Sequence, residues 1–97
     1  MIVFVDIDET ICDTPSDPRD YSMAKPRIDV IEKINKLYDD GNTVVYWTAR
    51  GGVSKIDWSE LTKGQLKSWG ARYTELRLDK PPYDVFYDDK AMDIGML

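Results

Sequence analysis

Histidine is absent from this sequence of 97 residues, and cysteine occurs once, as Cys12. Without histidine, the chain cannot form Ser-His or Cys-His nucleophile pairs, or zinc sites built on imidazole. A single cysteine cannot close an intramolecular disulfide, which is typical of a reducing compartment. The sequence has no apolar stretch long enough to span a bilayer, and its first residues lack the pattern of a signal peptide. We therefore expect a cytoplasmic protein with no membrane partner.

Positive charge is scarce, because 13 basic residues face 18 acidic ones and the net charge is -5. Most affinity for nucleic acid or anionic membranes comes from Lys and Arg that meet phosphates. This balance argues against a nucleic-acid partner. A small phosphorylated substrate remains compatible with it where a metal ion and a few cations gather at one site.

The length allows one domain, 1–97, and the content of hydrophobic residues, 42%, is that of a folded protein. A domain of this size buries only about two thirds of the surface of its unfolded chain. Its apolar sheet surface and edge strands need protection, so we expect a homo-oligomer.

Hydrophobic patterning predicts strands that alternate with helices. An uninterrupted apolar run at 2–5 is typical of a strand buried on both faces, and residues 9–25 read as an irregular loop. Further strands are predicted at 43–47, 73–78 and 84–87, with helices from Pro26 to Gly41 and from Asp57 to Gly70. This order predicts an α/β fold with a mostly parallel sheet.

Polar side chains follow three of these strands directly. Asp6 and Asp8 follow the first, Thr48 the second, and Asp88 with Asp89 the fourth. Ligands of open parallel sheets bind at the carboxyl ends of the strands, so we expect these side chains to meet there. Clustered carboxylates repel one another, and Mg²⁺, which prefers oxygen ligands, relieves that repulsion. An Asp beside such an ion can attack phosphorus and form an aspartyl-phosphate.

The run Asp6-Ile7-Asp8-Glu9-Thr10 resembles the first motif of the haloacid dehalogenase superfamily. Thr48 at a strand end resembles its second motif, and the pair Asp88-Asp89 resembles its fourth. The resemblance implies a Rossmann-like three-layer sandwich with a mostly parallel central sheet, in its minimal form without a cap domain. It also implies a Mg²⁺-dependent phosphatase that acts on a small phosphorylated metabolite, such as a sugar phosphate or a nucleotide.

The resemblance assigns a role to each motif residue. Asp6 is the nucleophile and a metal ligand, and Asp8 is the general acid and base and also a metal ligand. Thr48 binds the phosphoryl group, and Asp88 with Asp89 complete the metal site. The third motif is a lysine, for which Lys80 is the best candidate, in a Pro-rich turn closer to the acid pair than is usual.

Two further residues are candidates for substrate binding. Thr10 supports the site or bonds only within its own loop, and Arg50 reaches the substrate or forms a surface ion pair. Two other functions remain open, a phosphomutase and a receiver-like module that accepts a phosphoryl group as a signal. A receiver carries its acid pair early and its phosphorylated Asp later, the reverse of the order here.

Overall fold

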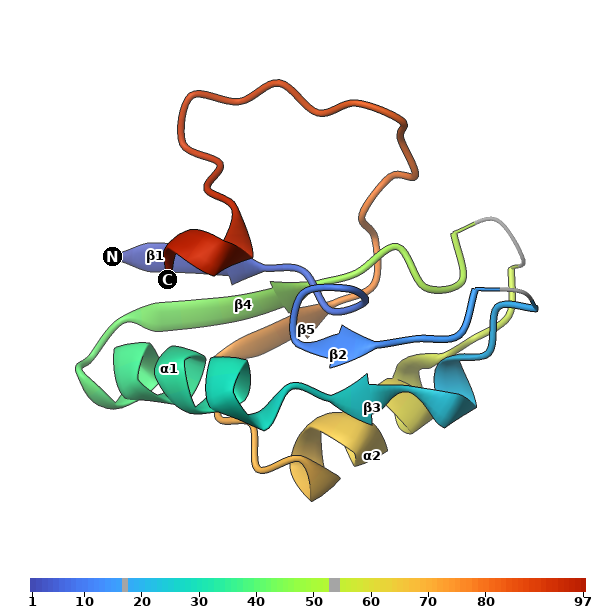
Figure 1. Cartoon of the computed structure of the whole chain (residues 1–97), viewed down its shortest axis with the longest axis horizontal. Helices are drawn as coiled ribbons and strands as arrows, with labels where there is room; N and C mark the ends of the chain where they lie inside the picture. Colours follow the sequence, from blue (N-terminus) through green and yellow to red (C-terminus); the bar gives the residue numbers. More distant parts are fainter. Residues whose placement is uncertain (17, 53–54) are drawn as a thin grey trace.

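The computed structural model describes residues 1–16, 18–52 and 55–97. Its centre is a parallel sheet of three strands in the order β1-β4-β5, formed by β1 (Ile2–Val5), β4 (Thr43–Trp47) and β5 (Glu75–Arg77). The register sets Ile2 opposite Thr43 and Val45 opposite Glu75. Because all three strands run the same way, their carboxyl ends share one edge of the sheet (Figure 1). The α/β class and the parallel sheet are confirmed.

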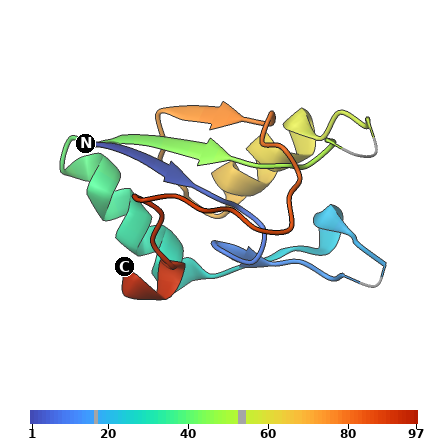
Figure 2. The ribbon, with the colours of Figure 1, turned by 90° about the horizontal axis from the view of Figure 1, so that it is seen from above.

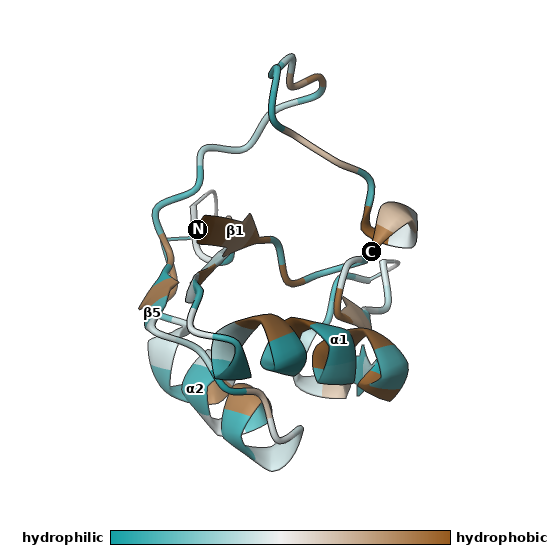
Figure 3. Cartoon of the chain, turned by 90° about the vertical axis from the view of Figure 1, so that its left-hand side faces the viewer, coloured by the Kyte–Doolittle hydropathy of each residue, from teal (hydrophilic) through white to brown (hydrophobic). Residues whose placement is uncertain are grey.

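Both helices lie on the same side of the sheet, where Figures 1 and 2 place α1 (Ile28–Asp39) and α2 (Ser59–Ser68). Apolar residues recur along α1 at helical spacing and give it one hydrophobic face, visible in Figure 3. Its buried side chains include Ile31 and Ile34, and the chain leaves the helix through Gly41 at a φ of 97°. Only glycine adopts that conformation without strain, which ends the helix there.

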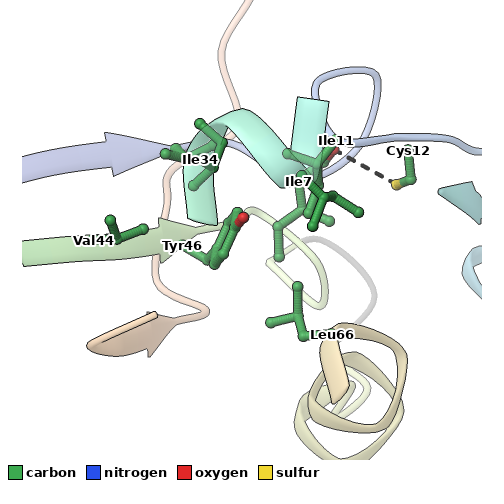
Figure 4. Packing of buried hydrophobic residues seen from close by; sticks show 9 residues of the cluster. Ile7, Ile11, Cys12, Ile34, Val44, Tyr46 and Leu66 are labelled. Carbon is green, nitrogen blue, oxygen red and sulfur yellow. Dashed lines mark hydrogen bonds between the residues drawn. The ribbon is translucent and has the colours of Figure 1, made fainter. Parts of the chain in front are cut away.

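The hydrophobic core fills the space between this face of the sheet and the two helices (Figure 4). Side chains alternate along a strand, so Val44 and Tyr46 of β4 enter the core while Val45 points to the opposite face. The helices contribute Ile34 and Leu66. The loop after β1 closes the core with three more side chains, those of Ile7, Ile11 and Cys12.

Residues 9–25, predicted to be an irregular loop, contribute to a small antiparallel ladder. Strand β2 (Cys12–Asp13) pairs with β3 (Lys25–Pro26), and a short 3-10 helix, η1 (Tyr21–Met23), precedes β3. Pro26 therefore belongs to β3, and α1 begins two residues later than its predicted start. The backbone N–H of Arg27 donates to the carbonyl of Ile11 at 2.8 Å, which ties this excursion to the start of α1.

The predicted strand at 84–87 does not form. Beyond Tyr83 the chain arches away from the sheet in Figure 1, and it then returns to η2 (Ile94–Met96) beside α1. The side chains of Val85, Phe86 and Tyr87 are exposed, so no neighbouring strand covers them. The described chain places its two α-helices on one face of the sheet, which shows an α/β fold without confirming the predicted three-layer sandwich. The opposite face leaves Ile2 and Phe4 exposed.

No helix in the described parts of the chain combines the length and the apolar character needed to cross a bilayer. The longest one, α1, has 12 residues and carries charged side chains along its outer face.

Leu66 provides a test of this packing, because its side chain is fully buried between α2 and the sheet. We expect Leu66→Ala to lower the free energy of unfolding by about 2–5 kcal/mol, through lost burial and the cavity left behind. Urea denaturation followed by circular dichroism measures the loss. Lys67→Ala, at the next and exposed position of α2, is the matched control and should change stability by less than about 0.5 kcal/mol. Equal losses for the two variants would contradict the packing described.

Candidate active site

Asp6 leaves the carboxyl end of β1 and opens the candidate site. Its carboxylate is 38% exposed, and the ammonium nitrogen of Lys80 lies 3.5 Å from one of its oxygens. The hydroxyl of Thr10 donates to the other oxygen at 3.3 Å. The structure thus brings together the predicted nucleophile, the predicted third-motif lysine and Thr10. Thr10 contacts Asp6 itself, which extends its role beyond its own loop.

Lys80 reaches Asp6 because hydrogen bonding between β4 and β5 continues past the ends of both strands. The N–H of Thr48 donates to the carbonyl of Arg77 at 2.9 Å, and the N–H of Lys80 donates to the carbonyl of Thr48 at 3.2 Å. These bonds fix the backbone of Lys80 beside the end of β4. Its side chain is only 15% exposed and passes near the rings of Trp47 and Tyr83. Although it lies in a Pro-rich turn, Lys80 is therefore well placed to contact a molecule bound beside Asp6.

Asp8 is held by a buried arginine rather than left free. The guanidinium of Arg50 donates to both carboxylate oxygens, from Nη2 at 2.8 Å and from Nε at 3.0 Å. The hydroxyl of Thr14 donates to one of the same oxygens at 2.6 Å, and Arg19 approaches to 3.9 Å. A bidentate pair of this kind fixes the direction of the carboxylate as well as its charge.

This environment shifts the pKa of Asp8 and the pKa of Cys12. Burial raises the pKa of Asp8, but the bonds from Arg50 and Thr14 outweigh that effect and hold the pKa below its usual value. Asp8 is therefore ionised at neutral pH in this arrangement. Burial raises the pKa of the Cys12 thiol to about 11, so this cysteine stays protonated and is a poor nucleophile.

Arg50 was predicted to bind substrate or to pair at the surface, and the structure gives it a different position. Its side chain is fully buried and also donates to Thr62 at 3.1 Å and to Gln65 at 2.6 Å, both on α2. Its guanidinium lies 4.7 Å from the ring centre of Tyr21. The bonds of Arg50 join the loop after β1, the end of β4 and α2. An arginine three residues past the end of a strand gives no sequence signal for that position.

The side chains at this edge surround a cavity of about 320 Å³. Its charged and hydroxyl-bearing walls are Asp6, Asp8, Thr48, Arg19, Arg50 and Lys80. Three cations against two anions make the cavity locally positive, although the chain as a whole is acidic. Thr48 is buried here, and its hydroxyl accepts a hydrogen bond from the N–H of Arg50 at 3.2 Å. Arg19 was missed by the sequence analysis because it lies in the irregular stretch.

The acid pair does not join this cavity. Asp88 and Asp89 are exposed in the arching segment, where Asp88 accepts from the N–H of Lys90 at 3.1 Å. Across the described residues, no group of three or more Asp, Glu, Cys or His side chains could hold a metal ion. The predicted four-acid Mg²⁺ site is therefore not assembled in this arrangement, which offers Asp6 and Asp8 alone.

Comparison with known proteins gives one informative match. No family model matches the chain, and no curated protein matches it. A crystal structure from Vibrio cholerae, described only as that of a numbered target, is 30% identical to the chain with a TM-score of 0.81. The match covers 98% of this chain and 85% of the Vibrio cholerae chain. The chain belongs to the family of that protein. Function is therefore inferred from the site itself.

The buried ion pair can be tested against an exposed one. Arg50→Ala leaves the Asp8 carboxylate without its main partner in a poorly solvated place, and we expect a loss of about 3–5 kcal/mol in unfolding free energy. Arg72→Ala breaks the exposed pair with Asp39 and should cost at most about 1 kcal/mol. Urea unfolding of both variants measures the difference. If the two losses are the same, the Asp8–Arg50 pair does not hold this site together.

Proposed function

We propose that this protein is a Mg²⁺-dependent phosphomonoester hydrolase whose nucleophile is Asp6. One observation supports this most directly. The carboxylate of Asp6 is exposed to a locally positive cavity, while Lys80 and Thr10 hold its two oxygens. A carboxylate aimed into a site that attracts anions is suited to attack on a phosphoryl group. Lys80 is placed to neutralise that group as a point charge.

The proposed reaction has two steps. In the first, a carboxylate oxygen of Asp6 forms a bond to phosphorus, the bond to the leaving oxygen breaks, and that oxygen takes up a proton. In the second, water attacks the same phosphorus, loses a proton, and the bond to Asp6 breaks to release inorganic phosphate. The resemblance assigns both proton transfers to Asp8. The pair with Arg50 favours the ionised form of Asp8, which supports its role as the base in the second step more directly.

The described residues do not bring the acids of the predicted metal site together. Mg²⁺ would neutralise phosphoryl oxygens, and the resemblance assigns it to Asp6, Asp8, Asp88 and Asp89. The acid pair stands in a segment away from the cavity, so the present arrangement does not fit that ion. Dependence on Mg²⁺ therefore follows from the motif order and is tested separately below.

Asp6→Asn tests the nucleophile. A neutral amide cannot form the acyl-phosphate, so we expect the hydrolysis of p-nitrophenyl phosphate to be abolished while the circular dichroism spectrum is kept. Asp29→Asn, the same change at an exposed position of α1, is the control and should retain full activity. Full activity in Asp6→Asn would rule out the mechanism. Turnover by the wild type also separates a hydrolase from a receiver-like module, which is phosphorylated without sustained release of phosphate.

Chelation tests the metal. We expect activity to disappear with excess chelator and to return with added Mg²⁺, and Asp88→Asn to raise the Mg²⁺ concentration needed for half-maximal activity. Asp84→Asn, an exposed acid of the same segment, is the control and should leave that concentration unchanged. Undiminished activity in excess chelator would remove the metal from the proposal and leave the Asp6 nucleophile to be judged by its own variant.

A further inference from the structure

A second cavity, of about 470 Å³, adjoins the one at Asp6. The two cavities share four wall residues, Arg19, Tyr21, Ala49 and Pro82. Asp6, Asp8 and Lys80 line the first cavity alone, and Trp58 lines the second alone. Ligand pockets have volumes of about 300–1,000 Å³, so each cavity is large enough to hold part of a small molecule. Their shared walls make them neighbouring compartments of one site.

The walls of the second cavity are mainly apolar and aromatic. Tyr21 and Trp58 meet edge to face, with ring centres 5.1 Å apart, and Pro82 lines the cavity with them. The guanidinium of Arg19 lies 5.4 Å from the centre of the Tyr21 ring, at the boundary between the cavities. Flat apolar walls beside a cation are suited to a ring that carries hydrogen-bond acceptors.

Both aromatic walls are anchored to the scaffold. The carbonyl of Tyr21 accepts from the side chain of Gln65 at 2.6 Å, and the Tyr21 ring packs against the buried Arg50. Trp58 is the N-cap residue directly before α2, and its carbonyl accepts from the N–H of Thr62 at 2.9 Å. Residues fixed in this way keep their positions when a ligand enters, which favours a preformed subsite.

A polar group of this subsite lacks a partner. The indole nitrogen of Trp58 is buried and has no hydrogen-bond partner among the described residues. Buried N–H groups are nearly always paired, and an unpaired one calls for an explanation. The nitrogen has almost no exposed surface, so an acceptor on a bound ring would pair with it after a small shift of the Trp58 side chain. Arg19 adds a cation at the cavity boundary, where its guanidinium donates to Glu9 at 3.1 Å and lies 3.9 Å from Asp8.

We infer that the cavity bordered by Tyr21, Trp58 and Pro82 binds the leaving group of the substrate, and that this group contains a ring with an apolar face and acceptor atoms. The inference rests on the proposed function, because the phosphoryl group must lie at Asp6 for the ring to reach its neighbour. A nucleoside and a cyclic sugar share this chemistry. An open-chain alcohol phosphate, such as glycerol phosphate, cannot fill the cavity and binds less well.

The test compares three phosphomonoesters: adenosine 5′-monophosphate, glucose 6-phosphate and glycerol 3-phosphate. We expect the wild type to prefer at least one ring-bearing ester in kcat/KM by about tenfold or more, since ring stacking on one aromatic side chain is worth about that factor. Trp58→Ala should remove most of this preference, mainly through KM. Hydrolysis of glycerol 3-phosphate should change by less than about twofold.

Two further variants separate the contributions. Trp58→Phe keeps a ring but removes the indole N–H, so it should retain most of the preference if stacking dominates and lose it if the hydrogen bond dominates. Tyr38→Ala removes an exposed aromatic ring from α1, away from both cavities, and should leave the preference intact. Equal losses for ring-bearing and open-chain esters in Trp58→Ala, or a wild type without any preference, would overturn the subsite.

Failure of the proposed function gives a different result from failure of the subsite. If no phosphomonoester is hydrolysed, the hydrolase proposal fails, and equilibrium binding then decides the subsite. Titration calorimetry should show that adenosine monophosphate or glucose 6-phosphate binds the wild type at least tenfold more tightly than inorganic phosphate does. In Trp58→Ala, the ester and inorganic phosphate should bind with equal affinity. Equal affinities in the wild type, or no binding of either ester, would overturn the subsite on this measurement.

Discussion

The ion pair between Asp8 and Arg50 is the constraint on which the candidate site depends. A buried guanidinium is costly to desolvate, and it is tolerated here because Asp8, Thr62 and Gln65 accept most of its hydrogen bonds. The pair connects the loop after β1 to the start of the chain beyond β4 and to α2. Through the ring of Tyr21, which lies against the same guanidinium, it also supports the wall shared by the two cavities.

The sequence was most informative where local pattern and long-range packing agree. The strands at 2–5 and 43–47 could be predicted with their exact bounds, because uninterrupted β-branched and aromatic runs suit the centre of a parallel sheet. Lys80 was proposed only through the resemblance, as the third-motif lysine, and the structure places its ammonium nitrogen 3.5 Å from the Asp6 carboxylate. Whether residues 84–87 form a strand could not be predicted from their local pattern alone. A run such as Val85-Phe86-Tyr87 favours a strand only where a neighbour supplies hydrogen bonds, and the described chain pairs it with none.

The remaining parts of the site arise from contacts between segments far apart in the chain. Arg50 could be noticed because it follows Thr48, but its burial depends on α2, whose Thr62 and Gln65 supply acceptors. Arg19 and Tyr21 lie in a stretch with breakers and no periodicity, so nothing in the sequence marks them as cavity walls. No cap domain was predicted, and the candidate site residues came from the motifs. The second cavity is built from residues outside every motif.

The parallel pairing of β1 with β4 has a consequence for how the chain acquires its shape during synthesis. β1 is synthesised before its hydrogen-bonding partner β4, which begins at Thr43, and before Lys80. At about 5–20 residues per second, the apolar run of β1 waits for several seconds without a neighbour. Such non-local pairing slows folding and leaves an aggregation-prone apolar strand exposed until its partner is available. Until β4 has been made, β1 is therefore a segment that benefits from chaperone protection.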